Sequence, residues 1–322
     1  MKNILVVGGA GYIGSHMVKM LGEQGHKVST LDNLSSGHKS SVLFGEFFEG
    51  DMQNEKLVCR ILIDKKIDLV MHFASNIEVS ESTVNPKKYY QNNVVNTLSL
   101  LNSMLKCNVK NFIFSSTAAI FGNASSDKIK ENSTTNPVNP YGKSKLIIEN
   151  ILDDYDAAYS LKSIIFRYFN AAGADPSGKI GELHDPESHL IPLMIRAYLQ
   201  NRQFFIFGDD YDTFDGTCIR DFVHVSDICS AHLKGIDFLI KENKSDKFNL
   251  GNGEGYSINE VVSCFEKLVG KQIDAVIKER RAGDPPHLVA DSSKAKKILG
   301  WTPNHSSLEE IIKDALNFYE SI

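Results

Sequence analysis

Three glycines between an apolar stretch and a helical pattern constrain the fold of this chain more than any other feature. The stretch ILVVGGAGYIGSH begins at residue 4 and carries Gly8, Gly11 and Gly14 directly after its β-branched residues. Glycines at this spacing allow a tight turn, let the backbone approach a pyrophosphate, and seat a helix close to a strand. The N-terminus of that helix then faces the phosphate charge. The pattern therefore predicts a strand, turn and helix that bind a dinucleotide.

An acidic residue follows where such a site needs one. The next apolar run, residues 27–31, ends in Asp32, which lies 18 residues after Gly14. A carboxylate at this position accepts hydrogen bonds from the adenosine ribose and repels a 2′-phosphate. We therefore expect the cofactor to be NAD rather than NADP.

Strand-like and helical stretches alternate through the first half of the chain. The apolar runs are residues 3–7, 27–31, 68–73, 111–115 and 162–168, and the helical stretches are 12–24, 54–64, 86–106 and 141–159. This alternation predicts an α/β fold, a Rossmann-type doubly wound parallel sheet with helices on both faces.

The alternation fades after residue 170, which indicates a second domain. The remainder mixes helices with short strands near 203–207, 247–250 and 273–277, and ends in an amphipathic helix at about 308–319. We expect an NAD-binding domain at 1–168 and a smaller mixed α/β substrate-binding domain at 169–322, with some segments returning to the first domain. The polar stretch 123–140 is expected to be a loop.

Tyr141 and Lys145 in NPYGKSK carry the expected chemistry. Their spacing of four places both side chains on one face of a helix, and Pro140 suits the first turn of that helix. A lysine charge near the phenol would lower its pKa, so that the tyrosine could act as a base. Thr117 ends the apolar run NFIFSST, and hydroxyls at the carboxyl end of a parallel strand point into the ligand crevice.

Composition excludes several classes of function. The chain has 322 residues with 35 basic and 40 acidic side chains, a net charge of −5 and no basic tract, so we expect no nucleic-acid partner. It lacks a run of 18 apolar residues, so we expect no membrane partner. Five cysteines without a C-x-x-C pair and histidines without i, i+4 spacing give no reason to expect a disulfide framework or a metal. These features favour a cytoplasmic location.

Eleven segments follow one another along the chain: GGAGYIGSH, LDNLSSG, EGD at 49–51, HFAS, YYQNNV, FSSTAAIFG, NPYGKSK, RYFNAAG, DGTCIRDFVHV, NLGNGEGYS and RAGDPP. In this order they give the chain an end-to-end resemblance to the extended short-chain dehydrogenase/reductase family, in its branch of nucleotide-sugar 4-epimerases. The glycine motif and Y-x-x-x-K specify only the superfamily, whereas DGTCIRDFVHV and RAGDPP are more specific. The resemblance implies interconversion of UDP-glucose and UDP-galactose at C4 through a 4-keto intermediate, with bound NAD and a homodimer.

The resemblance also assigns residues. It implies catalytic roles for Tyr141, Lys145 and Thr117. It implies NAD contacts for Gly8, Gly11, Tyr12, Ile13, Gly14, Asp32, Asn33, Asp51, Met52, Phe73, Ala74, Asn93, Tyr141, Lys145 and Phe169. It implies contacts with the UDP-hexose substrate for Thr117, Asn170, His189, Leu190, Phe207, Arg220, Arg281, Asp284 and Leu288. The two arginines suit a diphosphate, because guanidinium groups stay charged and bond in pairs.

Two rival functions remain beside the epimerase. One is an NAD-linked oxidoreductase of another nucleotide sugar, and the other is a non-catalytic NAD-binding scaffold. A 4,6-dehydratase is disfavoured, because Thr117 is followed by Ala118 and Ala119 rather than by the acidic pair that such chemistry needs. Leu288 replaces a tyrosine seen in relatives that accept only unsubstituted hexoses, so the N-acetylhexosamine pair is a further expected substrate.

Overall fold

The computed structural model of the chain describes residues 1–123, 128–281 and 284–322 and divides into two compact units. Unit 1 comprises Met1–Ile120, Pro137–Arg167 and Cys229–Phe248. Unit 2 comprises Phe121–Asn136, Tyr168–Ile228 and Asn249–Ile322. Residues 124–127 of the loop predicted at 123–140, and residues 282 and 283 of RAGDPP, lie outside the described residues.

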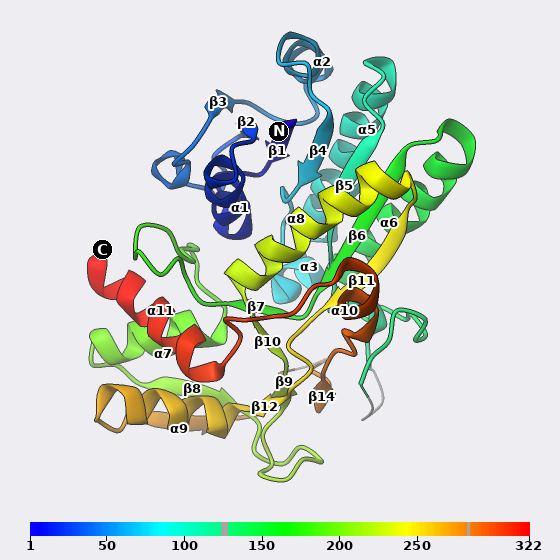
Figure 1. The fold of residues 1–322 in the computed structure, drawn as a ribbon. Helices are drawn as coiled ribbons and strands as arrows, with labels where there is room; N and C mark the ends of the chain where they lie inside the picture. The colour runs from blue at the N-terminus through cyan, green and yellow to red at the C-terminus, as the bar shows by residue number, and fades with distance from the viewer. Residues whose placement is uncertain (124–127, 282–283) are drawn as a thin grey trace. The chain divides into compact units, whose positions relative to one another are not determined.

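A seven-stranded sheet forms the centre of unit 1 (Figure 1). Its strands are β1 (Asn3–Val7), β2 (Lys27–Asp32), β3 (Glu46–Glu49), β4 (Leu69–His72), β5 (Asn111–Thr117), β6 (Lys162–Tyr168) and β11 (Asp246–Leu250). Their spatial order is β11-β6-β5-β4-β1-β2-β3, and parallel pairings join β3, β2, β1, β4 and β5 in turn. This is the order of a Rossmann-type sheet, with its switch point between β1 and β4, so the predicted fold class is confirmed.

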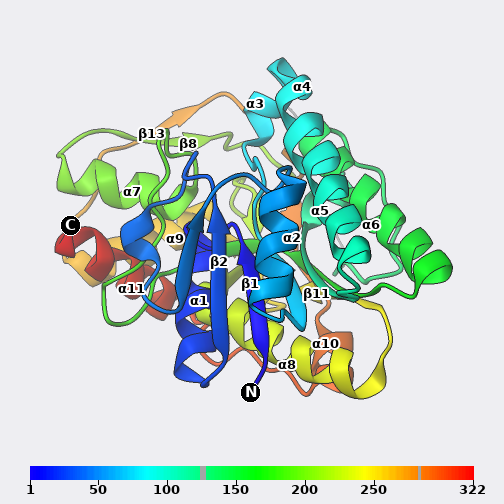
Figure 2. The same ribbon diagram turned by 90° about the horizontal axis from the view of Figure 1, so that it is seen from above.

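Helices cover both faces of this sheet (Figure 2). They are α1 (Tyr12–Glu23), α2 (Glu55–Asp64), α5 (Thr97–Lys106), α6 (Pro140–Tyr159) and α8 (Val225–Glu242). Leu5 and Val7 of β1 share one buried cluster with apolar residues of α2, α5 and α6. On the opposite face a Cβ at Gly235 of α8 would lie 2.8 Å from the Phe166 ring of β6. Burial on both faces explains why the strands are continuous apolar runs rather than alternating ones.

The helical stretch predicted at residues 86–106 contains a change of helix type. It begins with α4 (Pro86–Tyr89), passes through the π-helix η2 (Tyr90–Asn96) and ends as α5, after the short helix α3 (Val79–Val84). The wider turn buries Asn93, whose Nδ2 donates to Ser144 Oγ of α6 at 3.1 Å. Unit 1 also contains the 3₁₀ turn η1 (Lys39–Ser41). A second 3₁₀ turn, η3 (Ala118–Phe121), lies where the chain passes from unit 1 into unit 2.

Unit 2 combines helices with small sheets. Its helices are α7 (Leu190–Leu199), α9 (Ile258–Val269), α10 (Ser293–Leu299) and α11 (Leu308–Ser321). Its strands are β7 (Asn170–Ala172), β8 (Phe204–Phe207), β9 (Ile219–Arg220), β10 (Phe222–His224), β12 (Tyr256–Ser257), β13 (Ala275–Lys278) and β14 (His287–Leu288), in the sheets β10-β7, β12-β9-β14 and β13-β8. Apolar residues of α7, α9 and α11 form its core. Among the described residues, no helix has both the length and the apolar character needed to cross a bilayer.

Candidate active site

The glycine turn between β1 and α1 has the close backbone contacts that the sequence predicts. Gly8 has a φ of +81°, and a Cβ on it would lie 2.4 Å from the backbone nitrogen of Ala74. A Cβ on Gly14 would lie 2.1 Å from the carbonyl oxygen of Gly8. Gly11 stands at the N-cap of α1 and has no side chain to cap the helix, so the first amides, from Tyr12 onward, can bond a phosphate. The turn therefore fits the pyrophosphate of a dinucleotide.

The acidic group predicted to hold the ribose lies at the carboxyl end of β2. Asp32 is buried, and its two carboxylate oxygens accept from the backbone nitrogens of Ala10 at 2.9 Å and Leu34 at 2.8 Å. The neighbouring Asn33 donates to Asp51 Oδ2 at 2.9 Å. The structure thus brings three of the residues expected to bind adenosine together, and the buried Met52 follows Asp51 in sequence.

Other residues expected to bind NAD stand at the end of β4 and in η2. Phe73 and Ala74 follow β4, and the Phe73 amide donates to Val7 of β1 at 2.7 Å. Asn93 accepts from the Asn76 amide at 2.9 Å.

Two further residues expected to bind NAD lie elsewhere in the fold. Ile13 lies in the first turn of α1. Phe169 belongs to unit 2, where its amide donates to the Leu250 carbonyl at 3.0 Å.

The sequence around Tyr141 determines where its helix begins. The Asn139 side chain caps α6 by accepting from the Gly142 amide at 2.8 Å, and Pro140 occupies the first position. Tyr141 therefore lies in the first turn, partly buried, and Thr117 at the end of β5 is near enough for its hydroxyl to lower the pKa of Tyr141 by hydrogen bonding. One turn further, Lys145 is 1% exposed, and its Nζ donates to Ser75 Oγ at 2.6 Å and to the Ser115 carbonyl at 2.7 Å. The predicted catalytic trio thus comes together.

The electrostatics of the trio differ from the sequence-based expectation. Burial raises the pKa of Tyr141, the hydrogen bond from Thr117 opposes this rise, and the charge of Glu78 adds to it. Burial lowers the pKa of Lys145 to about 7, against the pull of Glu149. The expected lowering of the Tyr141 pKa by Lys145 is therefore not what this arrangement shows. The lysine is held by two serine groups, and the threonine stabilises the phenolate.

A buried ion pair beneath the trio was missed from the sequence. Glu149 of α6 accepts from Ser116 Oγ at 2.6 Å and from Arg167 Nη2 at 2.6 Å. It lies four residues after Lys145 and eight after Tyr141, so the pattern Y-x₃-K-x₃-E marks one helix face. That spacing is the signal that could have identified it.

In unit 2 three residues predicted to bind the substrate lie together. Arg220 of β9 is buried, donates from Nη1 to the Pro285 carbonyl at 2.8 Å, and has Nη2 3.5 Å from Asp284 Oδ1. Leu288 of β14 pairs in register with Arg220, so the two residues are neighbours across the small sheet. The strands β9 and β14 are therefore what position this group.

Two further predicted contacts stand beside these. The guanidinium of Arg281 lies 4.1 Å from the ring centroid of Phe207 at the end of β8. Asn170 of β7 has a buried Oδ1 with no hydrogen-bond partner among the described residues. A buried acceptor left in this way costs free energy, and a donor on a ligand would satisfy it.

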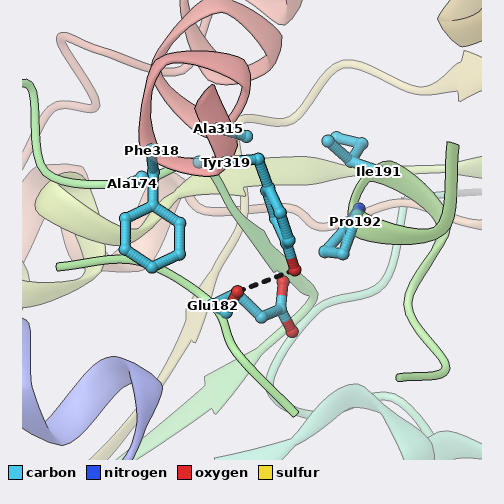
Figure 3. Close-up of a pocket in the computed structure, with 8 residues that line it drawn as sticks. Ala174, Glu182, Ile191, Pro192, Ala315, Phe318 and Tyr319 are labelled. Atoms are coloured by element: carbon cyan, nitrogen blue, oxygen red, sulfur yellow. Dashed lines mark hydrogen bonds between the residues drawn. The ribbon is translucent and has the colours of Figure 1, made fainter. Parts of the chain in front are cut away.

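His189 and Leu190 stand at the start of α7, His189 as its N-cap and Leu190 as its first residue. His189 Nδ1 contacts Glu182 Oε1, and burial, which lowers the pKa of His189, is outweighed by this carboxylate, so that the pKa rises to about 8. The small pocket nearby, lined by Glu182, Tyr319 and six other residues, is too narrow for a water molecule (Figure 3). Its lining includes neither His189 nor Leu190.

The fold and these residues define a class: a Rossmann-type enzyme with a dinucleotide turn and a tyrosine, lysine and threonine as reactive groups. The sequence profile of the NAD dependent epimerase/dehydratase family matches residues 4–251, and the chain belongs to this family.

Individual relatives resemble the chain over nearly its whole length. A UDP-glucose 4-epimerase of Halalkalibacterium halodurans is 48% identical over 98% of this chain and 95% of its own. The crystal structure of UDP-glucose 4-epimerase from Brucella ovis in complex with NAD has a TM-score of 0.96 at 44% identity, covering 99% of this chain and 98% of that one. The UDP-Glc/GlcNAc 4-epimerase of Campylobacter jejuni has a TM-score of 0.88 at 41% identity, with 100% of both chains covered.

Proposed function

We propose that the protein interconverts UDP-glucose and UDP-galactose by inverting the configuration at C4 through a 4-keto intermediate. The observation that carries this function is the placement of Tyr141 one turn before the buried Lys145 on α6, whose Nζ donates to the Ser115 carbonyl at 2.7 Å, near the end of β5 where Thr117 stands. The Halalkalibacterium and Brucella relatives reported above are both named UDP-glucose 4-epimerases, which supports this proposal. NAD, held by the glycine turn and Asp32, would supply a hydride acceptor at C4 and return the hydride.

Side chains of the protein transfer the proton of the sugar 4-hydroxyl and position the substrate. Tyr141 as phenolate takes the proton of the sugar 4-hydroxyl and later returns it. Thr117 stabilises the phenolate by its hydrogen bond and can bond the same sugar oxygen. Lys145 is fixed by Ser75 and Ser115, so its position does not depend on the substrate. Arg220 and Arg281 supply the charge that a diphosphate requires.

The test is to incubate the purified protein with UDP-galactose or UDP-glucose, without added NAD, and to resolve the products. We expect the same equilibrium mixture from both sides and no accumulation of NADH. NADH formed in proportion to product would instead identify a net oxidoreductase. An absence of turnover in protein shown to retain NAD would identify a non-catalytic scaffold.

A second activity, on the N-acetylhexosamine pair, is favoured by Leu288. Leu288 pairs with Arg220, so it stands on the surface proposed to hold the sugar nucleotide, and leucine is smaller than tyrosine. The Campylobacter relative is named for both glucose and N-acetylglucosamine substrates. The smaller leucine side chain leaves room for the N-acetyl group, whereas a tyrosine ring would exclude it. We therefore expect Leu288→Tyr to suppress turnover of UDP-N-acetylglucosamine while sparing UDP-glucose. Equal loss on both substrates would refute this role.

We further propose a homodimer formed through η2, α5 and α6. Val95 of η2 and Ile147 and Tyr159 of α6 are exposed apolar side chains, and η2 is joined to α6 by the Asn93–Ser144 hydrogen bond. Sedimentation should give twice the chain mass of 35.8 kDa. Ile147→Glu should yield the single-chain mass, whereas Ile277→Glu, at an exposed position of β13, should not.

A cytoplasmic location also remains a proposal. It is supported by the five cysteines, all within the described residues, none of which forms a disulfide.

A further inference from the structure

Four side chains with metal-binding atoms converge in unit 2, immediately before α7. Glu182, His184, Glu187 and His189 each offer one such atom, and these atoms all lie within 4.8 Å of one another. The Nδ1 atom of His184 is 3.2 Å from Glu182 Oε1 and 3.8 Å from Glu187 Oε1. The Nδ1 atom of His189 contacts Glu182 Oε1 and is 3.9 Å from Glu187 Oε1. Two imidazoles and two carboxylates therefore face a common point.

These separations are close to the edges of a metal coordination polyhedron. Tetrahedral ligands at 2.0–2.1 Å from a zinc ion are about 3.3 Å from one another. The separations of 3.2, 3.8 and 3.9 Å lie within about 0.6 Å of that value, whereas the widest in the cluster, at most 4.8 Å, would shorten by up to about 1.5 Å when an ion binds. In addition, the Nδ1 atom of His184 is buried and makes no hydrogen bond of normal geometry within the described part of the chain, although it lies at ion-pair distance from both carboxylates. A cation between these groups would bind the nitrogen and both carboxylates directly.

The surroundings hold the carboxylates in place. Glu187 Oε1 accepts from the backbone nitrogens of Ser188 at 2.8 Å and His189 at 3.0 Å. Its other oxygen lies 3.4 Å from the Tyr319 hydroxyl and 3.9 Å from Arg196 Nη2. The Tyr319 hydroxyl also donates to the Glu182 carbonyl at 2.8 Å, as Figure 3 shows. Such supporting bonds orient the ligands of metal sites before the ion binds.

Burial makes the cluster a closed site with one open side. The side chains of Glu182 and Glu187 are 4% and 0% exposed, that of His184 is 17% exposed, and that of His189 is 44% exposed. An ion could enter past His189. Four protein ligands would then complete its coordination, which is the pattern of a structural rather than a catalytic site.

We propose that Glu182, His184, Glu187 and His189 form a Zn²⁺ site that fixes the segment leading into α7. A mixed nitrogen and oxygen ligand set favours zinc over Mg²⁺ or Ca²⁺, which prefer oxygen alone. This site is not predictable from the sequence pattern, because the spacing E-x-H-x-x-E-x-H differs from the helical i, i+4 pattern and a turn is needed to bring the four residues together. The zinc test does not depend on the proposed epimerase activity, because it measures metal binding, although His189 is also one of the residues expected to contact the substrate.

The test uses the full chain, treated with a chelator and then titrated with Zn²⁺ under a large excess of Mg²⁺. Calorimetry and elemental analysis should show one zinc bound per chain, and zinc should raise the melting temperature because it binds only the folded form. His184→Ala and Glu187→Gln should each weaken zinc binding by more than tenfold, the scale set by losses of supporting groups alone. His305→Ala is the matched control, since His305 Nδ1 also faces one carboxylate, Glu310 Oε1 at 2.7 Å, outside the cluster.

Cobalt gives a readout in the unmodified protein, so the result does not depend on the variants folding. Co²⁺ bound by two nitrogens and two oxygens in tetrahedral geometry should give intense visible absorption that zinc abolishes. Three outcomes would each overturn the proposal. They are zinc bound well below one equivalent per chain, a cobalt spectrum typical of the hydrated ion, and an equal loss of zinc affinity in His305→Ala and His184→Ala. The four groups would then be a network of ion pairs only.

Discussion

Tyr141 is the residue whose chemistry is most directly testable. If it transfers the proton of the sugar hydroxyl, Tyr141→Phe should reduce kcat by roughly 10² to 10⁴, the usual contribution of a general acid-base group. The phenyl ring keeps the packing of the first turn of α6, so bound NAD should be retained. Steady-state kinetics and the absorbance of cofactor released on denaturation measure the two effects. A kcat within a few-fold of the original protein would remove Tyr141 from the reaction.

Thr117 is predicted to set the pH at which Tyr141 works. Burial raises the pKa of Tyr141 and the Thr117 hydrogen bond opposes that rise, so losing the bond should raise the pKa further. In Thr117→Val, the ascending limb of the pH profile of kcat should therefore move to higher pH. Thr117→Ser keeps the hydroxyl and should restore the original profile. If the pH profiles of kcat for Thr117→Val and the original protein coincide, the hydroxyl of Thr117 does not set the pKa of Tyr141.

Among elements, the first turn of α6 links stability to chemistry. Asn139 caps this turn through the Gly142 amide, and Asn139→Ala should cost about 1 kcal/mol of unfolding free energy. Because Tyr141 lies in the same turn, kcat should fall as well. Ser307→Ala removes the corresponding cap of α11, where Ser307 Oγ accepts from Glu310 at 3.2 Å. Urea unfolding should show similar losses for both variants, whereas kcat should fall only in Asn139→Ala.

The elements differ in how well the sequence predicts them. The strands β1, β2, β4, β5 and β6 were predicted to within two residues at each end, because strands buried on both faces are unbroken apolar runs. The short edge strand β3, with sequence EFFE and no fully buried residue, was missed. The π-helix was also missed, since apolar spacing does not distinguish it from an α-helix.

Unit 2 was predicted only in outline. Its strands β9, β12 and β14 have two residues each, so they are too short to carry a periodic pattern, and their pairing depends on partners far along the chain.

The candidate site was predicted in part. Motifs identified the trio of Thr117, Tyr141 and Lys145, whereas the serines that hold Lys145 became evident only from the packing.

At the scale of the whole molecule, His72 should make stability depend on pH. It is buried at the end of β4, and burial, together with the charge of Lys145, lowers its pKa to about 3 from 6.5. Between these values the unfolded chain binds a proton that the folded chain does not, so stability should fall as pH decreases below 6.5. The slope from this one group is at most about 1.4 kcal/mol per pH unit.

The measurement is urea unfolding between pH 4 and 7. His72→Leu should be less sensitive to acid than the original protein over this range. His305→Leu is the control with the opposite sign, because the hydrogen bond with Glu310 raises the pKa of His305 and favours the folded state at low pH. Parallel stability curves for His72→Leu and the original protein would contradict the assignment.

The position of β11 in the central sheet has a consequence for synthesis of the chain on the ribosome. β11 is the outermost strand beside β6, yet it begins at Asp246, long after β6 ends at Tyr168. During translation the backbone of β6 is therefore made well before the strand that pairs with its outer edge. An unpaired strand edge is a template for association with other chains. Chains released early, before residue 246, would consequently be prone to aggregate and dependent on chaperones.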